Sequence, residues 1–223
     1  MEPEVIEVMA RLEMRDGQER AQGLPGSERI QALHPDSGRF VYVLALAKGA
    51  KSIVEVGTSH GYSTLWLAAA AKANGGKVVT YDINPERIAA ARKNFADAGL
   101  DDVIEIVEGD ARQTLRDRTE PVDLLFIDSE RSYYETFFDV VYQRLVKGGL
   151  VIADNVISHQ DELEDYISYV ENHPNLESSL VPIGRGLEIS VKLAIASTWK
   201  LVFGNCCSIS TVKCGTPVPI YEE

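Results

Sequence analysis

The sequence contains few cysteines and no long hydrophobic run, and these absences exclude several classes of protein. Its only cysteines are Cys206, Cys207 and Cys214, near the end of the 223-residue chain. An odd number without a CxxC pair fits neither a disulfide framework nor a zinc site, so we expect reduced thiols. No apolar segment approaches the length needed to cross a bilayer, which predicts a protein without a membrane span.

Positive charge is also scarce in this sequence. The chain has 22 basic and 34 acidic residues, which gives a formal net charge of −12. Nonspecific binding to nucleic acid or to an anionic membrane depends on a positive field, so this balance argues against both partners. The N-terminal stretch MEPEVIEVMARLEM has no basic region of the kind that begins a signal peptide. We therefore predict a cytoplasmic location.

Short strand-like and helix-like segments alternate from Lys51 onward. Apolar, β-branched runs at 52–56, 77–82, 103–107, 122–128 and 149–154 alternate with helical patterns at 61–73, 85–98, 111–117, 132–145 and 161–172. This alternation implies right-handed crossovers and a parallel sheet with helices on both faces. Residues 177–193 differ, because Gly184-Arg185-Gly186 joins two strand-like runs into a hairpin. The sequence thus predicts an α/β fold, a Rossmann-like, seven-stranded, mostly parallel sheet with a C-terminal antiparallel hairpin.

Two further segments flank this alternation. Residues 3–15 place apolar side chains at helical spacing, which predicts a first helix. We assign residues 1–35 to an N-terminal helical segment that forms a substrate wall, a lid or a dimer contact. Residues 36–193 form the main domain, and the tail at 194–223 has no clear period and no predicted role.

Acidic residues end or follow the successive predicted strands. They are Glu55, Asp82, Asp110, Asp128 and Asp154, the last of which precedes Asn155. Each has a structural explanation when taken alone, since Asp and Asn favour helix caps and turns. The carboxyl ends of parallel strands meet at one edge of the sheet, where ligands bind. The convergence of these acids on that edge therefore favours a shared ligand.

The first turn, VEVGTSHGYST, restricts the kind of nucleotide that could bind there. Gly57 and Gly61 permit close approach of the backbone, but neither G-x-G-x-x-G nor G-x-x-x-x-G-K-[ST] occurs. An edge lined with carboxylates would repel the phosphates of a dinucleotide or of a nucleoside triphosphate. The pattern favours a nucleoside that lacks phosphates and carries positive charge, such as S-adenosylmethionine. Asp82 is then positioned to accept hydrogen bonds from the ribose hydroxyls.

Five motifs resemble, in sequence and in order, those of the class I S-adenosylmethionine-dependent methyltransferases. They are VEVGTSHGYSTLWLA, VVTYDINPE, VEGDARQTL, LLFIDSERSYYE and GGLVIADNV. More narrowly, residues 30–193 resemble the cation-dependent O-methyltransferases of the catechol and caffeoyl-CoA type, and SLVPIGRGLEISVKL is similar to their closing hairpin. The resemblance implies a cofactor site made of Glu55, Gly57, Tyr62 and Ser63 around the methionine part, Asp82 at the ribose, Asp110 and Ala111 at the adenine, and Asp128.

The same resemblance implies a divalent cation bound by Asp128, Asp154 and Asn155. Two carboxylates and an amide oxygen are hard donors, which suit Mg²⁺, or alternatively Mn²⁺ or Ca²⁺, better than zinc. Such an ion would lower the pKa of an acceptor hydroxyl and orient the two oxygens of a vicinal diol. The structural alternative is that Asp128 caps the next helix and that Asp154-Asn155 opens a loop.

Arg131 departs from the pattern of the resembling family. In that family a lysine commonly lies three residues after the first cation-binding aspartate, as a general base or a positive orienting group. Arginine stays protonated, so it can orient a substrate or stabilise an oxyanion but cannot act as a base. The alternative is a simple pairing of Arg131 with Glu130, Glu135 or another surface acid. His159 is a second candidate base, against a loop histidine without a role.

Together these features predict an S-adenosylmethionine-dependent O-methyltransferase that uses a divalent cation and acts on a hydroxylated small molecule, such as a catechol-like vicinal diol. The expected catalytic residues are Asp128, Arg131 and His159, and the expected assembly is a homodimer. The alternatives are a cation-independent O-methyltransferase for a sugar or a hydroxylated tRNA base, and a catalytically idle protein that binds the same cofactor. A dehydrogenase is a more distant alternative.

Overall fold

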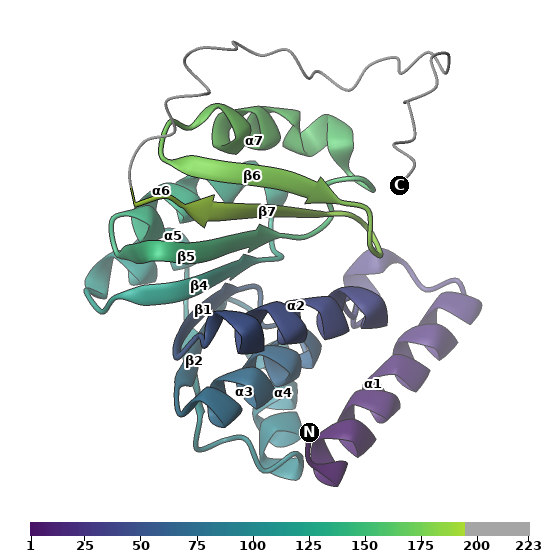
Figure 1. The fold of residues 1–223 in the computed structure, drawn as a ribbon. Coiled ribbons are helices and arrows are strands. Elements are labelled where there is room, and N and C mark those ends of the chain that lie inside the picture. Colours follow the sequence, from purple (N-terminus) through teal and green to yellow (C-terminus); the bar gives the residue numbers. More distant parts are fainter. Residues whose placement is uncertain (195–223) are drawn as a thin grey trace, which may run out of the picture.

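A computed structural model describes residues 1–194, and its centre is a seven-stranded sheet (Figure 1). The strands are β1 (Ser52–Val56), β2 (Lys77–Asp82), β3 (Ile104–Glu108), β4 (Val122–Ile127), β5 (Leu145–Ala153), β6 (Leu176–Val181) and β7 (Leu187–Lys192). Their order is β3-β2-β1-β4-β5-β7-β6, with β1 to β5 parallel and β7 antiparallel to both of its neighbours. The predicted α/β fold with a closing antiparallel hairpin is confirmed.

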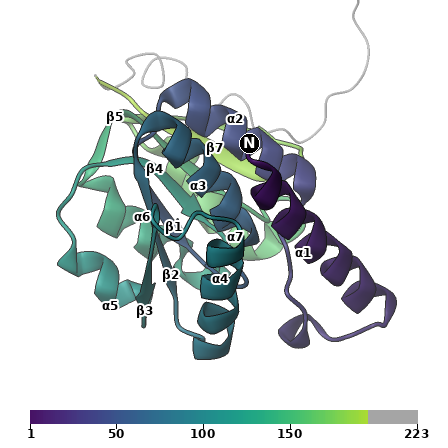
Figure 2. The same cartoon turned by 90° about the horizontal axis from the view of Figure 1, so that it is seen from below.

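Helices cover both faces of the sheet (Figures 1 and 2). One face carries α1 (Pro3–Ala21), α2 (Pro35–Lys48), α3 (Tyr62–Asn74) and α4 (Pro85–Asp97), and the other carries α5 (Ala111–Thr114), α6 (Tyr134–Tyr142) and α7 (Gln160–Asn172). Short 3-10 turns occupy 26–28, 115–117 and 131–133. Successive side chains of a strand point to opposite faces, so Ile53 packs in one hydrophobic cluster and Val54 in the other.

One difference from the predicted elements lies after β4. The sequence predicts one helix over 132–145, but α6 ends at Tyr142 and β5 begins at Leu145. Leu145 continues the apolar spacing of the helix, yet it pairs with Val122 of β4, and the Val122 amide donates to the carbonyl of Arg144 at 3.0 Å. Sheet pairing therefore overrides the local helical pattern at this point.

The first helix is longer than predicted, and the predicted tail falls almost wholly outside the described residues. Helix α1 continues to Ala21 rather than ending near residue 15. Apart from residue 194, the tail and its three cysteines lie outside the residues that the structure describes. Within residues 1–194, no helix is long and apolar enough to cross a membrane.

Helix α1 fixes the segment that follows it at the edge of the sheet. Arg11 pairs with Asp97 of α4 at 2.8 Å, which holds α1 against that helix. Near the C-terminal end of α1, the buried carboxylate of Glu19 accepts a hydrogen bond from the Ile30 amide at 2.7 Å. Residues 30–33 are thereby placed beside the carboxyl ends of the central strands, where they line a cavity.

Glu188 of β7 is a fully buried carboxyl group with no hydrogen-bond partner among the described residues. Burial raises its pKa to about 8, from an ordinary value of 4.5. Between these two pH values the folded protein keeps a proton that the unfolded chain releases. The contribution of Glu188 to stability is therefore lost progressively as the pH rises through this window.

Replacing Glu188 by Gln should remove this pH-dependent loss. We expect Glu188→Gln to raise the free energy of unfolding by about 2–4 kcal/mol near pH 8, and by much less near pH 4.5. Urea unfolding at a series of pH values measures the difference from the parent. Glu164→Gln on the exposed side of α7 is the control, and it should change stability little at any pH. A Glu188→Gln difference that does not grow with pH would contradict the explanation.

Candidate functional site

A cavity of about 530 Å³ opens at the carboxyl ends of the parallel strands. Ten of the residues predicted for the site line it: Gly57, Tyr62, Ser63, Asp82, Asp110, Ala111, Asp128, Arg131, Asn155 and His159. Two predicted residues, Glu55 and Asp154, are fully buried and are not part of its lining. The structure therefore brings nearly all of the predicted residues to one cavity, although they come from five separate stretches of chain.

The turn after β1 depends on glycine at two positions. Gly57 has φ +108°, and a Cβ placed there would lie 1.9 Å from the carbonyl oxygen of Asp128. Gly61 has φ +88°, and its Cβ would lie 2.3 Å from the ring of Phe95. The backbone of this turn thus runs directly against the residue that follows β4, a contact that the glycines alone did not predict.

Asp82 holds the same turn from the end of β2. One carboxylate oxygen accepts from the Ser59 amide at 2.7 Å, and the other accepts from the Asn84 amide at 2.8 Å. Ser59 has φ +47°, a conformation that sequence patterns did not reveal. A carboxylate oxygen can accept more than one hydrogen bond, so Asp82, which lines the cavity, could also accept from a ligand hydroxyl.

Glu55 lies beneath the turn, although the sequence placed it around the methionine part of a cofactor. Its Oε2 accepts from the hydroxyls of Thr64 at 2.5 Å and Thr80 at 2.6 Å, while Oε1 has no partner in the described part of the chain. Burial raises the pKa of Glu55 to about 7, against the opposing effect of its hydroxyl partners. Above it, the Tyr62 hydroxyl donates to Glu13 of α1 at 2.6 Å, which joins the N-terminal helix to the cofactor turn.

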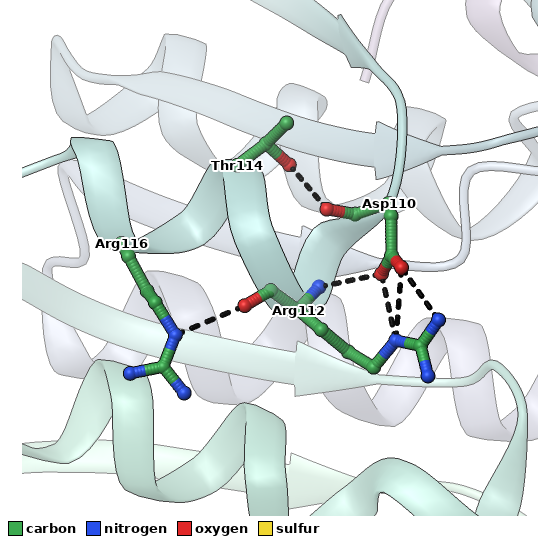
Figure 3. A network of polar contacts seen from close by, with 4 residues as sticks. All are labelled: Asp110, Arg112, Thr114 and Arg116. Atoms are coloured by element: carbon green, nitrogen blue, oxygen red, sulfur yellow. Dashed lines mark hydrogen bonds and ion pairs between the residues drawn. The ribbon is translucent and has the colours of Figure 1, made fainter.

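Asp110 begins α5 and is held by its own neighbour in the chain (Figure 3). Its carboxylate accepts from the Arg112 amide at 2.9 Å and from the Arg112 guanidinium at 2.5–2.9 Å. The guanidinium beside it lowers the pKa of Asp110. Arg112 also lies over the ring of Tyr133, 4.3 Å from its centroid. The helix-cap explanation of Asp110 is therefore correct, and the cap also builds one wall of the cavity.

Asp128, Asp154 and Asn155 come together at the ends of β4 and β5. The Asn155 amide donates to Asp128 Oδ1 at 2.8 Å, and Asn155 adopts φ +72°. Both oxygens of Asp154 are buried without a partner among the described residues. Burial, with the charge of Asp128 added, raises the pKa of Asp154 to about 8, and burial also raises the pKa of Asp128.

This donor set fits a hard divalent cation. The partly exposed carboxylate of Asp128 lies near the fully buried carboxylate of Asp154, which has no hydrogen-bond donor among the described residues. This arrangement costs free energy unless a cation or a proton is bound. Within residues 1–194, no group of three His, Cys, Asp or Glu side chains could hold a metal ion, so a cation at this place would need the amide oxygen of Asn155 as its third side-chain donor. Oxygen-only donors match Mg²⁺ or Ca²⁺ rather than zinc.

The two other predicted catalytic residues differ in how they are held. Arg131 donates to Glu162 of α7 at 2.8 Å, so it does pair with a surface acid, although not with Glu130 or Glu135. His159 lies at the start of α7 with its Nδ1 2.9 Å from the Ser158 hydroxyl. Both side chains line the cavity.

Sequence reasoning missed Arg185 and the balance of charge in the cavity. Arg185, in the turn between β6 and β7, donates to Asn155 Oδ1 at 3.5 Å. Its positive charge opposes the effect of burial on the pKa of Asp128. The lining includes four acids (Asp82, Asp110, Asp128 and Glu130) and four arginines (Arg87, Arg112, Arg131 and Arg185). The predicted carboxylates are therefore present at this edge, but arginines from helices and from the hairpin reach the same space and balance their charge.

The comparison with known families agrees with this geometry. The model of the O-methyltransferase family matches residues 18–193. The chain belongs to the O-methyltransferase family. The matched part runs from within α1 to the end of the β6–β7 hairpin. All the residues that line the cavity therefore lie within the matched part.

Individual relatives of this O-methyltransferase family member share its fold and much of its length. A catechol O-methyltransferase from Niastella koreensis is 36% identical over 138 residues, which are 60% of this chain and 62% of that protein. A probable caffeoyl-CoA O-methyltransferase 2 from Dictyostelium discoideum is 29% identical over 175 residues, 69% of this chain and 74% of its own. The chain thus spans less than two thirds of the Niastella koreensis protein, at 62%.

A solved structure extends the comparison to three dimensions. The O-methyltransferase from Bacillus cereus in complex with SAH is 25% identical and superposes with a TM-score of 0.71, covering 86% of this chain and 91% of that one. The sheet order and the closing hairpin described above are therefore those of a solved O-methyltransferase.

Proposed function

We propose that this protein transfers a methyl group from S-adenosylmethionine to a hydroxyl of a small molecule, with a divalent cation. The observation that carries the proposal is a single cavity. One part of its lining is the Gly57 turn with Asp82, which suits a nucleoside. Another part is the Asp128–Asn155 pair, which suits a cation and an acceptor. The relatives named catechol and caffeoyl-CoA O-methyltransferases support a vicinal diol as the acceptor.

The cofactor would bind along the ends of β1, β2 and β3. Asp82 would accept hydrogen bonds from the ribose, because its carboxylate is already fixed by two backbone amides. Gly57, Tyr62 and Ser63 would surround the methionine part, while Glu55 would act from below by fixing the turn. Asp110 and Ala111 would lie against the adenine. The solved relative in complex with SAH supports the choice of cofactor.

Asp128, Asp154 and Asn155 would hold the cation. When bound there, a divalent cation supplies positive charge that favours the ionised form of an acceptor hydroxyl. The fixed backbone after β5, with Asn155 in a left-handed conformation, keeps these donors in place. Magnesium is the proposed ion, with manganese or calcium as alternatives, because all the donors are oxygens.

Arg131 and His159 would act on the acceptor in different ways. Arg131 cannot accept a proton, and its guanidinium is held by Glu162, so its role is to contribute positive charge at the cavity wall. His159 has one ring nitrogen engaged with Ser158 and can use the other to accept the hydroxyl proton. Residues 30–33, placed by α1, would form the wall beside the cofactor turn, because the Ser59 hydroxyl donates to the Ile30 carbonyl at 3.1 Å.

Removing the cation tests the proposal directly. Labelled S-adenosylmethionine and catechol should give methylated product with Mg²⁺, and EDTA should lower the rate by about 100-fold or more, with recovery when Mg²⁺ is restored in excess. Full activity in EDTA would instead favour a cation-independent enzyme. Tight binding of S-adenosylmethionine without turnover on any hydroxylated compound would favour the idle binding protein. A homodimer and a cytoplasmic location stay predictions from the sequence.

A further inference from the structure

A second cavity lies directly beside the first and shares part of its wall. It has a volume of about 340 Å³ and lies between α1 and the segment of residues 32–35. Ala32, Leu33 and Arg185 line both cavities. Arg185 thus stands at the boundary between the space that holds the candidate cation site and a smaller space next to it.

The backbone of Arg185 is fixed relative to the candidate cation site. Its carbonyl accepts hydrogen bonds from the amides of Ile157 at 2.9 Å and Ser158 at 3.0 Å, directly after Asn155 in the chain. The Gly186 carbonyl accepts from the Val156 amide at 3.2 Å. The turn between β6 and β7 is therefore bound to the loop that follows β5, and the guanidinium reaches the cavity from a rigid base.

Arg185 differs from Arg112 and Arg131, two other arginines of the main cavity, in having no carboxylate partner. Arg112 is bound to Asp110, and Arg131 is bound to Glu162. Among the described residues, no carboxylate lies within 4.0 Å of the Arg185 guanidinium, and its one hydrogen bond goes to a neutral amide oxygen at 3.5 Å. A guanidinium has five donor hydrogens, so most of those on Arg185 are left for a ligand.

The carboxylates of the second cavity are engaged elsewhere. Asp16 pairs with Arg20 at 2.6 Å, and Glu13 accepts from the Tyr62 hydroxyl at 2.6 Å. Neither carboxylate pairs with Arg185. The charge of Arg185 acts on Asp128 without forming an ion pair, so the guanidinium donors remain available to an anion that enters from the main cavity.

We propose that Arg185 binds a carboxylate of the methyl acceptor at the boundary of the two cavities. The inference rests on the proposed function, since it assigns the acceptor of that same site. The planar, two-donor edge of a guanidinium matches a carboxylate. Because the guanidinium lies 3.5 Å from Asn155 Oδ1, the carboxylate and the reacting hydroxyls belong to one compact molecule. The acceptor class is a dihydroxylated aromatic acid rather than a neutral or cationic catechol.

The test compares three acceptors of similar size that differ in charge. They are 3,4-dihydroxybenzoate, its neutral amide 3,4-dihydroxybenzamide, and the cationic catechol dopamine. We expect the parent to show a kcat/KM at least about tenfold higher for the acid than for the amide, and lower still for dopamine, as a charge-assisted hydrogen bond implies. Arg185→Gln should bring the ratio of acid to amide close to one while turnover of the amide persists. Arg185→Lys should retain part of the preference.

The control variant and a binding measurement keep this inference separate from the proposed function. Arg92→Gln, on the exposed side of α4, should leave the ratio unchanged. Calorimetry of 3,4-dihydroxybenzoate binding to the protein loaded with S-adenosylhomocysteine and Mg²⁺ needs no turnover, and affinity should fall about tenfold or more in Arg185→Gln.

Turnover of the amide without preference for the acid would overturn the inference and leave the proposed function standing. If no acceptor is methylated, the proposed function fails, and calorimetry alone decides the role of Arg185. The inference about Arg185 is then overturned if the parent does not bind 3,4-dihydroxybenzoate, or if the parent and Arg185→Gln bind it equally well.

Discussion

Asp128→Asn should lower kcat/KM for catechol by about 10²–10³-fold and make the remaining activity nearly indifferent to Mg²⁺. Asp128 is the carboxylate that faces both the cavity and the Asn155 amide. The variant keeps the shape of the side chain but reduces the charge of the donor set from two carboxylates to one. Activity assays with and without EDTA, and calorimetry of Mg²⁺ binding, measure the two consequences.

A second aspartate on the same strand provides the matched control. Asp123, toward the opposite end of β4, accepts from the amides of Lys51 and Ser52 at 2.8 Å and 2.9 Å. Asp123→Asn keeps an acceptor oxygen there and should change kcat/KM less than about twofold. Both variants should retain the circular dichroism of the parent. Asp123→Asn keeps an acceptor for the two amides, and Asp128→Asn removes a charge that disfavours the ionised form of Asp154. The cation hypothesis is wrong if Asp128→Asn is as active as the parent and equally indifferent to chelation.

Gly57→Ala should lower the free energy of unfolding by more than about 3 kcal/mol and abolish cofactor binding in any protein that still folds. The new Cβ would lie 1.9 Å from the Asp128 carbonyl oxygen and 2.7 Å from its carbonyl carbon. These are backbone atoms at the end of a central strand, so the contact cannot be relieved by a side-chain rotation. Relief requires the turn and the end of β4 to separate, which would also displace Asp128.

Gly75→Ala separates the steric clash from the cost of the backbone conformation. Gly75 also has a positive φ, +71°, but a Cβ there would meet nothing within 4 Å. The expected loss is about 1 kcal/mol, the ordinary cost of a left-handed alanine. Urea unfolding and calorimetry with S-adenosylhomocysteine measure both variants. Equal losses in the two would show that the close approach to β4 is not what requires glycine at residue 57.

Local pattern was sufficient for elements bounded by turn residues. The predicted ranges of β1 and β2 agree with the structure to the residue, because β-branched runs there lie between Gly, Asn and charged residues. The helix predicted over 132–145 was wrong at its end, where Leu145 suits a helix and a strand equally. Its pairing with Val122, a residue more than twenty positions earlier, decided between them.

Site residues could be predicted where their position has a local cause, and could not be predicted where it depends on contacts with distant segments. The acids at the strand ends were predictable, because a parallel sheet brings the carboxyl ends of its strands to one edge. The partners of those acids were not. Glu162, which binds Arg131, and Arg185, which reaches Asn155, come from later elements whose approach leaves no mark on the local sequence.

The sequence by itself determined the order of strands and helices along the chain and the presence of an acid at or just beyond the end of each of the five parallel strands, since both depend on residue type and short-range spacing. Only the tertiary structure decided which acids face the cavity and which lie beneath it, as Glu55 and Asp154 do. It also decided that arginines balance the acids around the ligand space. The physical reason is that burial and charge pairing depend on which distant segments pack together, and packing is a property of the whole chain.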